Sequence, residues 1–385
     1  MAKVKDIAMQ IRGVSYHPED LHDNLDEDSV VLLRANNIKD GKLILDDVVY
    51  VSKSKVAEQQ YLQTGDILIC ASSGSKELVG KAAYIDSVGT PMTFGAFCKV
   101  VRPQSEYSEY LGHYFESPFY RNRISELSAG ANINNIKNEN IDNLEVRLVT
   151  EEKQNSIVEI LNQLNCLIFL RKQQLAKLDE LVKARFVEMF GDPVKNTMDW
   201  EIKPLSELGE LNRGVSKARP RNSPELLGGP YPLIQTGEVA NAKTYITSFN
   251  STYSEKGLAQ SKMWPKGTLC ITIAANIAQT SILTFDACFP DSVVGFISRN
   301  MTNELFIHYW FSFFQKILDE QAPQVAQKNI NLKILSELNV IVPPLSLQNR
   351  FAAFVERVDK QKQTVQQSLE KLELMKKALM QEYFG

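Results

Sequence analysis

Signatures of catalysis and metal binding are scarce in this sequence of 385 residues. It holds 5 cysteines and 4 histidines, and no two cysteines are close enough to form a local zinc or redox motif. It also lacks a Walker phosphate loop, a dinucleotide-binding glycine pattern, a His-Glu-x-x-His motif and the Asn-Pro-Pro-Tyr motif that holds a base in amino-methyltransferases. We therefore expect no catalytic residue, no metal site and no cofactor bound by this chain.

Long apolar runs and a charge excess of one sign are missing as well. The longest apolar clusters, 166–170 and 311–314, are far shorter than the about 18–20 residues that cross a bilayer. The first residues contain no apolar stretch typical of a signal peptide, so we expect a cytoplasmic protein without membrane contact. The net charge of −3 argues against coating nucleic acid by bulk charge, but it leaves room for a reader with local basic residues.

An internal repeat organises the chain. The last four residues, 382–385, resemble 188–191 at an offset of 194, and at this offset 15 of the 57 positions of 135–191 equal those of 329–385 without a gap. Chance gives only a few identities over such a length, so we interpret the match as a duplication.

The repeat continues upstream more weakly. Arg12-Gly13-Val14-Ser15 matches Arg213-Gly214-Val215-Ser216 at an offset of 201, and the segments 33–38 and 65–69 align with 234–239 and 267–271. A duplication that keeps its scaffold while its domain bodies diverge suggests one frame that presents two different binding surfaces. The predicted divisions are a first domain, 1–150, a long helix, 151–191, a second domain, 192–344, and a second long helix, 345–385.

Both connecting segments have the apolar spacing of a coiled-coil seam. The predicted seam residues are Ile157, Leu161, Leu164, Ile168, Leu175, Leu178, Val182, Phe351, Val355, Val358, Val365, Leu369, Leu372 and Leu379. Arg171, Arg185, Lys362 and Lys376 interrupt the seam. An antiparallel pairing closes the chain into a pseudo-two-fold object, and we favour it over a parallel one; an intermolecular coiled coil in a homodimer is the alternative.

The two domain bodies show mixed α/β patterns. Strand-like runs occupy 30–34, 66–70, 81–85 and 97–101 in the first copy, and 231–235, 268–273, 281–285 and 293–298 in the second. An aromatic helix follows in each, over 107–127 and 304–320. The predicted fold class is therefore α+β: two mixed α/β domains joined by two long antiparallel helices, with an internal repeat.

Local cations and amides at strand ends are candidate DNA contacts, since Lys and Arg neutralise phosphates while Arg, Asn and Gln read base edges. The candidates in the first copy are Arg34, Asn36, Asn37, Lys39, Ser73 and Lys76. Those in the second copy are Arg213, Lys217, Arg219, Arg221, Gln235, Thr236, Asn276 and Gln279. For each of them a solvated loop or ordinary turn chemistry is the competing interpretation.

The whole chain resembles the specificity (S) subunit of type I restriction-modification systems. The architecture carries the resemblance, together with the motifs of 65–69 and 80–83, the glycine-polar-Asn-Ile stretch of 130–136, and the Pro-Pro-Leu-x-x-Gln helix start of 343–348. The pattern departs from the family at Leu347 and Lys153, where a Glu is usual, and at Val149-Thr150-Glu151, which replaces Pro-Pro-Leu.

The resemblance implies two target recognition domains, each reading one half of a split double-stranded DNA target, and a helical pair that fixes the spacer. It further implies two modification methyltransferase subunits that dock on this chain and bring S-adenosylmethionine, and restriction subunits that join the complex. Two alternatives remain: a protein-binding scaffold that no longer reads DNA, and an enzyme that processes DNA by itself.

Overall fold

The chain folds into two compact units, each with one α/β body and half of each long helix. The computed structural model describes residues 1–75, 77–128, 135–274, 277–313 and 330–385. Unit 1 consists of 1–173 with 366–385, and unit 2 consists of 174–365. Below, the α/β part of unit 1 is head 1 and that of unit 2 is head 2.

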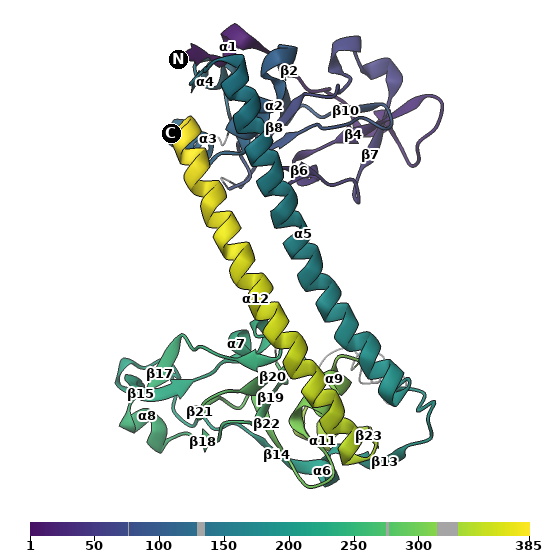
Figure 1. The fold of residues 1–385 in the computed structure, drawn as a ribbon, viewed down its shortest axis with the longest axis vertical. Coiled ribbons are helices and arrows are strands. Elements are labelled where there is room, and N and C mark those ends of the chain that lie inside the picture. Colours follow the sequence, from purple (N-terminus) through teal and green to yellow (C-terminus); the bar gives the residue numbers. More distant parts are fainter. Residues whose placement is uncertain (76, 129–134, 275–276, 314–329) are drawn as a thin grey trace. The chain divides into compact units, whose positions relative to one another are not determined.

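Head 1 is built on two four-stranded sheets (Figure 1). The first sheet has the order β2 (Ala8–Arg12), β11 (Cys98–Pro103), β8 (Ile67–Cys70) and β9 (Ala82–Tyr84). The second has the order β10 (Met92–Phe94), β4 (Ser29–Leu33), β7 (Val49–Ser52) and β3 (Leu21–His22). Two small pairs are β1 (Ala2–Lys3) with β12 (Glu145–Val146), and β5 (Ile38–Lys39) with β6 (Lys42–Leu43). Its helices are α1 (Val4–Ile7), α2 (Ser108–Glu116), α3 (Pro118–Ser128) and α4 (Asn138–Asp142).

Head 2 repeats this plan. Its larger sheet has the order β14 (Gly209–Arg213), β22 (Val293–Ser298), β19 (Leu269–Thr272), β20 (Thr280–Leu283) and β16 (Tyr245–Ile246). The smaller sheet has the order β17 (Ser251–Tyr253), β15 (Leu227–Leu233), β21 (Ala287–Cys288) and β18 (Met263–Trp264), and β13 (Glu201–Pro204) pairs with β23 (Asn339–Val342). Its helices are α6 (Leu205–Leu208), α7 (Thr236–Asn241), α8 (Glu255–Ala259), α9 (Glu304–Phe311) and α11 (Leu332–Glu337).

Strand pairing confirms the duplication where the sequence match is weak. In head 1, β4 pairs parallel with β10 and antiparallel with β7. In head 2, β15 pairs parallel with β21 and antiparallel with β17. Likewise β11 lies between β2 and β8, as β22 lies between β14 and β19. The offsets near 201 therefore join equivalent strands.

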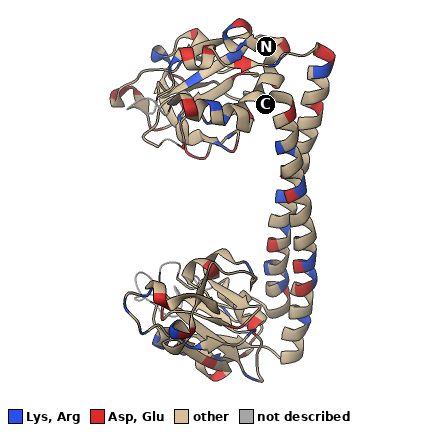
Figure 2. Ribbon diagram, turned by 90° about the vertical axis from the view of Figure 1, so that its left-hand side faces the viewer, with Lys and Arg blue, Asp and Glu red and all other residues tan. Residues whose placement is uncertain are grey.

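The long helices are α5 (Glu151–Phe190) and α12 (Leu345–Phe384), each of 40 residues and thus about 60 Å long. Each is a continuous ribbon in Figure 1, and its charged residues are spread along its length in Figure 2. Gly191, at a φ of 76°, ends α5 by donating its N–H to Val187 O at 2.8 Å.

Contacts within each unit show that the two helices are antiparallel, as predicted. In unit 1, Leu161 shares an apolar cluster with Phe384, whereas Arg171 Nε donates to Ser368 Oγ at 3.3 Å. In unit 2, Asp179 pairs with Lys362 at 2.6 Å, whereas the ring of Phe190 lies 5.4 Å from that of Phe351. In both units the residue numbers rise along α5 as they fall along α12.

All predicted seam residues are at least partly buried. Ten are buried: Ile157, Leu161, Leu164, Leu175, Val182, Phe351, Val355, Val358, Val365 and Leu369. Four are partly buried: Ile168, Leu178, Leu372 and Leu379. Phe186, Phe190, Met380 and Phe384 are also buried although they lie outside the predicted seam. Near the helix ends a head covers a second face of the helix, so the buried stripe widens there.

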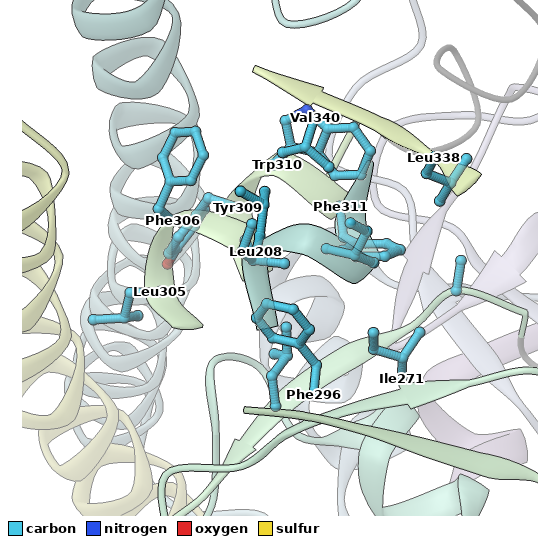
Figure 3. Packing of buried hydrophobic residues seen from close by; sticks show 14 of the residues in the cluster. Leu208, Ile271, Phe296, Leu305, Phe306, Tyr309, Trp310, Phe311, Leu338 and Val340 are labelled. Carbon is cyan, nitrogen blue, oxygen red and sulfur yellow. The ribbon is translucent and has the colours of Figure 1, made fainter. Parts of the chain in front are cut away.

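The aromatic helices anchor the long helices to the heads. In unit 2, Phe306, Tyr309 and Trp310 of α9 pack into a core with Phe296 of the sheet and Val340 of β23 (Figure 3). The single helix predicted over 107–127 is divided at Ser117, because Pro118 disfavours a helical conformation of the residue before it; Ser117 has a ψ of 149°. The helix predicted over 304–320 is described as α9, and residues 314–320 lie outside the described part.

Candidate DNA interface

Four chain segments meet at one edge of head 1. Val14 donates its N–H to Phe94 O at 2.7 Å, and Gly95 donates to Leu33 O at 2.9 Å. Ala71 and Ser72 both donate to Phe97 O, at 2.9 and 3.0 Å. These bonds join the ends of β2, β4 and β8 to the turn between β10 and β11. We call the segments 12–14, 33–37, 71–73 and 95–97 edge 1.

The equivalent segments of head 2 also meet at one edge, through different hydrogen bonds. Gly214 donates its N–H to Val293 O at 2.8 Å, Ile234 donates to Cys288 O at 2.9 Å, and Ile273 donates to Ser292 O at 3.0 Å. We call the segments 213–214, 234–236, 273–274 and 289–292 edge 2. Strand ends that converge on one edge place loop side chains on a rigid frame, which is the usual construction of a binding surface.

The Arg-Gly-Val-Ser repeat has a packing reason at both edges. A Cβ on Gly13 lies 2.1 Å from Gly95 O, and a Cβ on Gly214 lies 2.2 Å from Phe289 O. Only glycine lets the chain leaving β2 or β14 pass so close to the backbone of the neighbouring turn. The arginine before each glycine is exposed at the end of its strand.

The candidates at the end of β4 divide into two groups. Arg34 pairs with Asp47 at 3.1 Å, and Asn36 Nδ2 donates to the same carboxylate at 2.7 Å, so Asp47 holds both. Asn37 is 1% exposed; its Oδ1 accepts the N–H of Arg34, and its Nδ2 donates to two backbone carbonyls. This corrects the prediction for Asn37: its amide is used inside the turn and does not face a base.

The other candidates of the first copy lie in different loops. Lys39 is exposed in the β5–β6 hairpin, opposite Lys42 and two residues beyond the segment 33–37 of edge 1. Ser73 lies at edge 1, where its Oγ accepts the N–H of Ser75 at 3.2 Å. Lys76 lies outside the described residues.

Two of the four predicted cations at and after the end of β14 share one acid. Arg221 donates to Asp291 at 2.5 Å, and Arg219 lies 3.7 Å from the same carboxylate while donating to Ser216 O at 2.7 Å. Asp291 is part of edge 2, so these pairs bind the cationic loop to that edge. Arg213 and Lys217 are exposed.

The amide and hydroxyl candidates of head 2 follow β15 and β19. Gln235 is exposed just before α7, where its N–H donates to Glu238 Oε2 at 3.1 Å, and Thr236 is partly buried. Gln279 is exposed, and its backbone pairs with Thr272 across the loop. Asn276 lies outside the described residues.

Three residues near edge 1 were missed from the sequence. Arg12 is the repeat equivalent of the predicted Arg213, so the offset of 201 already pointed to it. Lys99 is its cross-strand partner in β11, and Phe97 is 70% exposed in the turn before that strand. No sequence signal separates Phe97 from a core phenylalanine, because an apolar residue beside a strand is normally buried.

Two other kinds of feature are absent from the described residues. They contain no group of three or more His, Cys, Asp or Glu side chains placed to hold a metal ion. In the same residues, no helix combines the length and the apolar character needed to cross a membrane.

Comparison with known proteins gives the family. The model of the type I restriction modification DNA specificity domain matches twice, over 13–180 and 197–374. The specificity subunit of the EcoKI type I restriction enzyme of Escherichia coli (strain K12) is 36% identical over 62% of this chain and 53% of its own length. The StySPI specificity subunit of Salmonella potsdam is 40% identical over 52% of this chain and 44% of its own length. The chain thus spans about half the length of the curated relatives it matches.

Solved structures share the fold across the full chain. A chain from work on complex assembly and conformational transition of the type I R-M system has a TM-score of 0.58 at 16% identity, over 100% of this chain and 96% of that one. The S subunit of the type I system of M. genitalium has a TM-score of 0.57 at 14% identity, over 100% and 95%. With two matching specificity domains in place, this chain belongs to the type I restriction modification DNA specificity family.

Proposed function

We propose that this chain is the sequence-specific DNA-binding subunit of a type I restriction-modification complex. Each head reads one half of a bipartite duplex target through its strand-end edge. The helical pair sets the number of unread base pairs between the halves. The chain itself is non-catalytic and acts in the cytoplasm.

The difference between the two edges carries this proposal. Both edges join equivalent strand ends, yet edge 1 has Phe97, Arg12 and Lys99 where edge 2 has Ser292, Arg213 and the fully buried Val294. Base edges are distinguished by the side chains that reach them, whereas phosphate contacts carry no sequence information. Two frames with different side chains fit two different half-sites, and therefore an asymmetric target.

Partners supply the chemistry in this proposal. Two modification methyltransferase subunits dock on the chain and bind S-adenosylmethionine, and restriction subunits join that complex. Exposed apolar residues on the long helices support docking: Ile160, Leu167, Leu170, Leu181, Leu374 and Met375. Several exposed apolar residues on one helix are typical of a surface that binds another helix.

Methylome sequencing of cells that express this chain with its modification subunit tests the function. We expect one bipartite methylated motif, and replacement of residues 1–150 by the head of a relative should change one half of it and leave the other half and the spacer unchanged. A motif that is not split, or one that changes in both halves, contradicts the division of labour. Methylation or cleavage by the purified chain alone contradicts the non-catalytic role.

A protein-binding scaffold without DNA reading is the alternative. It predicts that the chain binds the modification subunit while the complex shows no preference among duplexes. Measuring both affinities on one preparation separates the two functions.

A further inference from the structure

Phe97 stands out at edge 1 because its backbone holds the turn while its side chain does not. The carbonyl of Phe97 accepts two N–H groups, from Ala71 and Ser72, and the N–H of Cys98 donates to Gly95 O at 2.8 Å. Any residue can make these backbone bonds. The side chain is 70% exposed, so it gives up most of the stabilisation that burial of a phenylalanine provides.

The surroundings of Phe97 are cationic. Lys99 follows two residues later in β11 and lies directly opposite Arg12 of β2. Like charges at opposite positions of a ladder destabilise each other, and an anion placed beside them relieves this repulsion. Burial lowers the pKa of Lys99, Asp142 acts against this, and Arg12 lowers it further. Lys99 Nζ also donates to Asn138 Oδ1 at 2.5 Å.

Edge 2 has neither feature. The residue whose carbonyl accepts the N–H of Ile273 there is Ser292, and Arg213 faces Val294 across the ladder. The combination of an exposed aromatic ring and a like-charge pair is therefore particular to head 1.

We propose that Phe97 contacts the apolar surface of a base in the half-site read by head 1, and that Arg12 and Lys99 bind the flanking phosphates. A lone exposed apolar residue is common and needs no ligand. An exposed apolar ring beside two cations that face each other, with Asp142 offsetting only Lys99, suits a ligand that has both apolar surface and negative charge. Duplex DNA offers both, as thymine methyl groups and base faces within a polyanion. This inference rests on the proposed function and assigns one of its contact residues.

Affinity of the complex of this chain with its modification subunit tests the assignment. The duplexes carry either the methylome-derived target or a scrambled sequence. We expect Phe97→Ala to weaken target binding by at least about fivefold, the lower range for one mismatched base pair, without changing binding to the scrambled duplex. Phe97→Leu should retain part of the affinity. Met9→Ala, at the other end of β2 and 59% exposed, is the matched control and should bind as the wild type does.

Modified duplexes distinguish the two kinds of base surface. Replacing each thymine of the half-site by uracil removes one methyl group; a loss seen with the wild type but not with Phe97→Ala identifies a methyl contact. A rise of 2-aminopurine fluorescence at one step, abolished by Phe97→Ala, identifies a ring inserted between bases. Either coupling supports the inference.

Separate outcomes overturn the inference and the proposed function. If the wild type selects its target and Phe97→Ala binds it equally well, or if neither kind of modified duplex couples to Phe97, the assignment is wrong and the function stands. If the wild-type complex prefers no duplex, the function itself is wrong. An unchanged melting temperature of Phe97→Ala verifies that the turn is intact.

The proposed phosphate contact of Arg12 is tested by the salt dependence of binding. Arg12→Ala should weaken binding to target and scrambled duplexes alike, and it should lower the slope of log affinity against log salt by about one. An unchanged slope removes Arg12 from the assignment.

Discussion

The junctions between the long helices and the heads differ between the two units. In unit 1, Lys376 of α12 pairs with Glu116 of α2, beside His113, whose Nε2 lies 2.9 Å from Asn162 of α5. In unit 2, Lys362 of α12 is 8% exposed and pairs with Asp179 of α5 at 2.6 Å and with Asp359 at 3.4 Å. The cation of unit 1 thus ties helix to head, whereas that of unit 2 ties helix to helix.

This difference shows how the duplication diverged. The repeat offset pairs Lys362 with Ile168 and Lys376 with Val182, so each lysine is matched by an apolar residue in the other copy. Both cations come from α12. The two units therefore place their buried cation at non-equivalent positions of the repeat. Their stabilities should respond differently to equivalent substitutions.

The largest effect is expected from the aromatic anchors. Phe351 has Phe186, Phe190 and Tyr309 around it, each ring at 5.4 Å, so Phe351→Ala should lower the free energy of unfolding of unit 2 by about 3–5 kcal/mol. Phe384→Ala should cost unit 1 less, about 3 kcal/mol, because Phe384 has two ring neighbours, Tyr110 at 5.2 Å and Tyr114 at 5.9 Å, where Phe351 has three.

Urea unfolding measures this pair of variants. All three tryptophans, Trp200, Trp264 and Trp310, lie in unit 2, so their fluorescence follows that unit. Hydrogen exchange of α2 follows unit 1. Equal losses of unfolding free energy in Phe351→Ala and Phe384→Ala would contradict the expected difference between the two units.

Removal of the buried cations comes next. Lys362→Met leaves Asp359 without its partner; burial already raises the pKa of Asp359, and its buried Oδ2 makes no hydrogen bond. We expect a loss of about 3 kcal/mol in unit 2 by the same fluorescence assay. Lys376→Met should cost unit 1 only about 1 kcal/mol, since Glu116 keeps His113 and some contact with solvent.

A second substitution serves as the control for this prediction. Asp359→Asn added to Lys362→Met removes the stranded charge and should restore most of the stability. Failure of this rescue shows that Lys362 acts through packing rather than charge.

Substitution of the glutamines near the start of each long helix should give a smaller difference in stability between the two units. Gln348 donates to Met301 O and Pro343 O and accepts from Thr302 Oγ1 and the N–H of Asn303. In its repeat equivalent Gln154, the side-chain Nε2 donates to Val149 O, and the buried Oε1 has no hydrogen-bond partner among the described residues.

Gln348→Leu should therefore destabilise its unit by about 2 kcal/mol and Gln154→Leu by about 1 kcal/mol or less. Thermal unfolding measures both. Gln361→Leu, at an exposed position of α12, should change nothing. A larger effect at Gln154 contradicts the hydrogen-bond account.

Acid sensitivity separates the units most finely. Burial raises the pKa of Glu116, but the hydrogen bond from His113 and the charge of Lys376 outweigh it and lower the pKa to about 2. Burial lowers the pKa of His308, helped by Lys362, to about 4. Both groups have a lower pKa in the folded chain than in the unfolded chain. Their contribution to stability is therefore complete at a pH above the unfolded-state pKa. It is lost as the pH falls to the folded-state pKa.

The pH ranges over which the two units lose stability therefore differ. Unit 2 should lose the contribution of His308 between about pH 6.5 and 4, and unit 1 that of Glu116 between about pH 4.5 and 2. Fluorescence and hydrogen exchange across this range check the order, and Glu116→Gln should flatten only the lower window. Loss in unit 1 before unit 2 contradicts it.

The candidate interface could be predicted only in part. The strand ends that carry Arg34 and Gln235 follow from alternating patterns and turn residues, and they lie at edges 1 and 2, whereas no strand was predicted at Arg213, the last residue of β14. The role of Asn37 could not be predicted, because a turn-holding amide and a base-reading amide have the same sequence pattern. The exposure of Phe97 depends on four segments far apart in the chain.

The sequence by itself determined the duplication, the two long helices and the residues of their seam, because a period near 3.5 is a local property that places apolar side chains on one stripe. The tertiary structure alone decided which segments converge at edges 1 and 2, and which acids neutralise Lys362, Lys376, Arg219 and Arg221. Apart from the Asp359–Lys362 pair within α12, those contacts join residues distant in the chain, and their geometry depends on how strands pair and helices pack rather than on any local pattern.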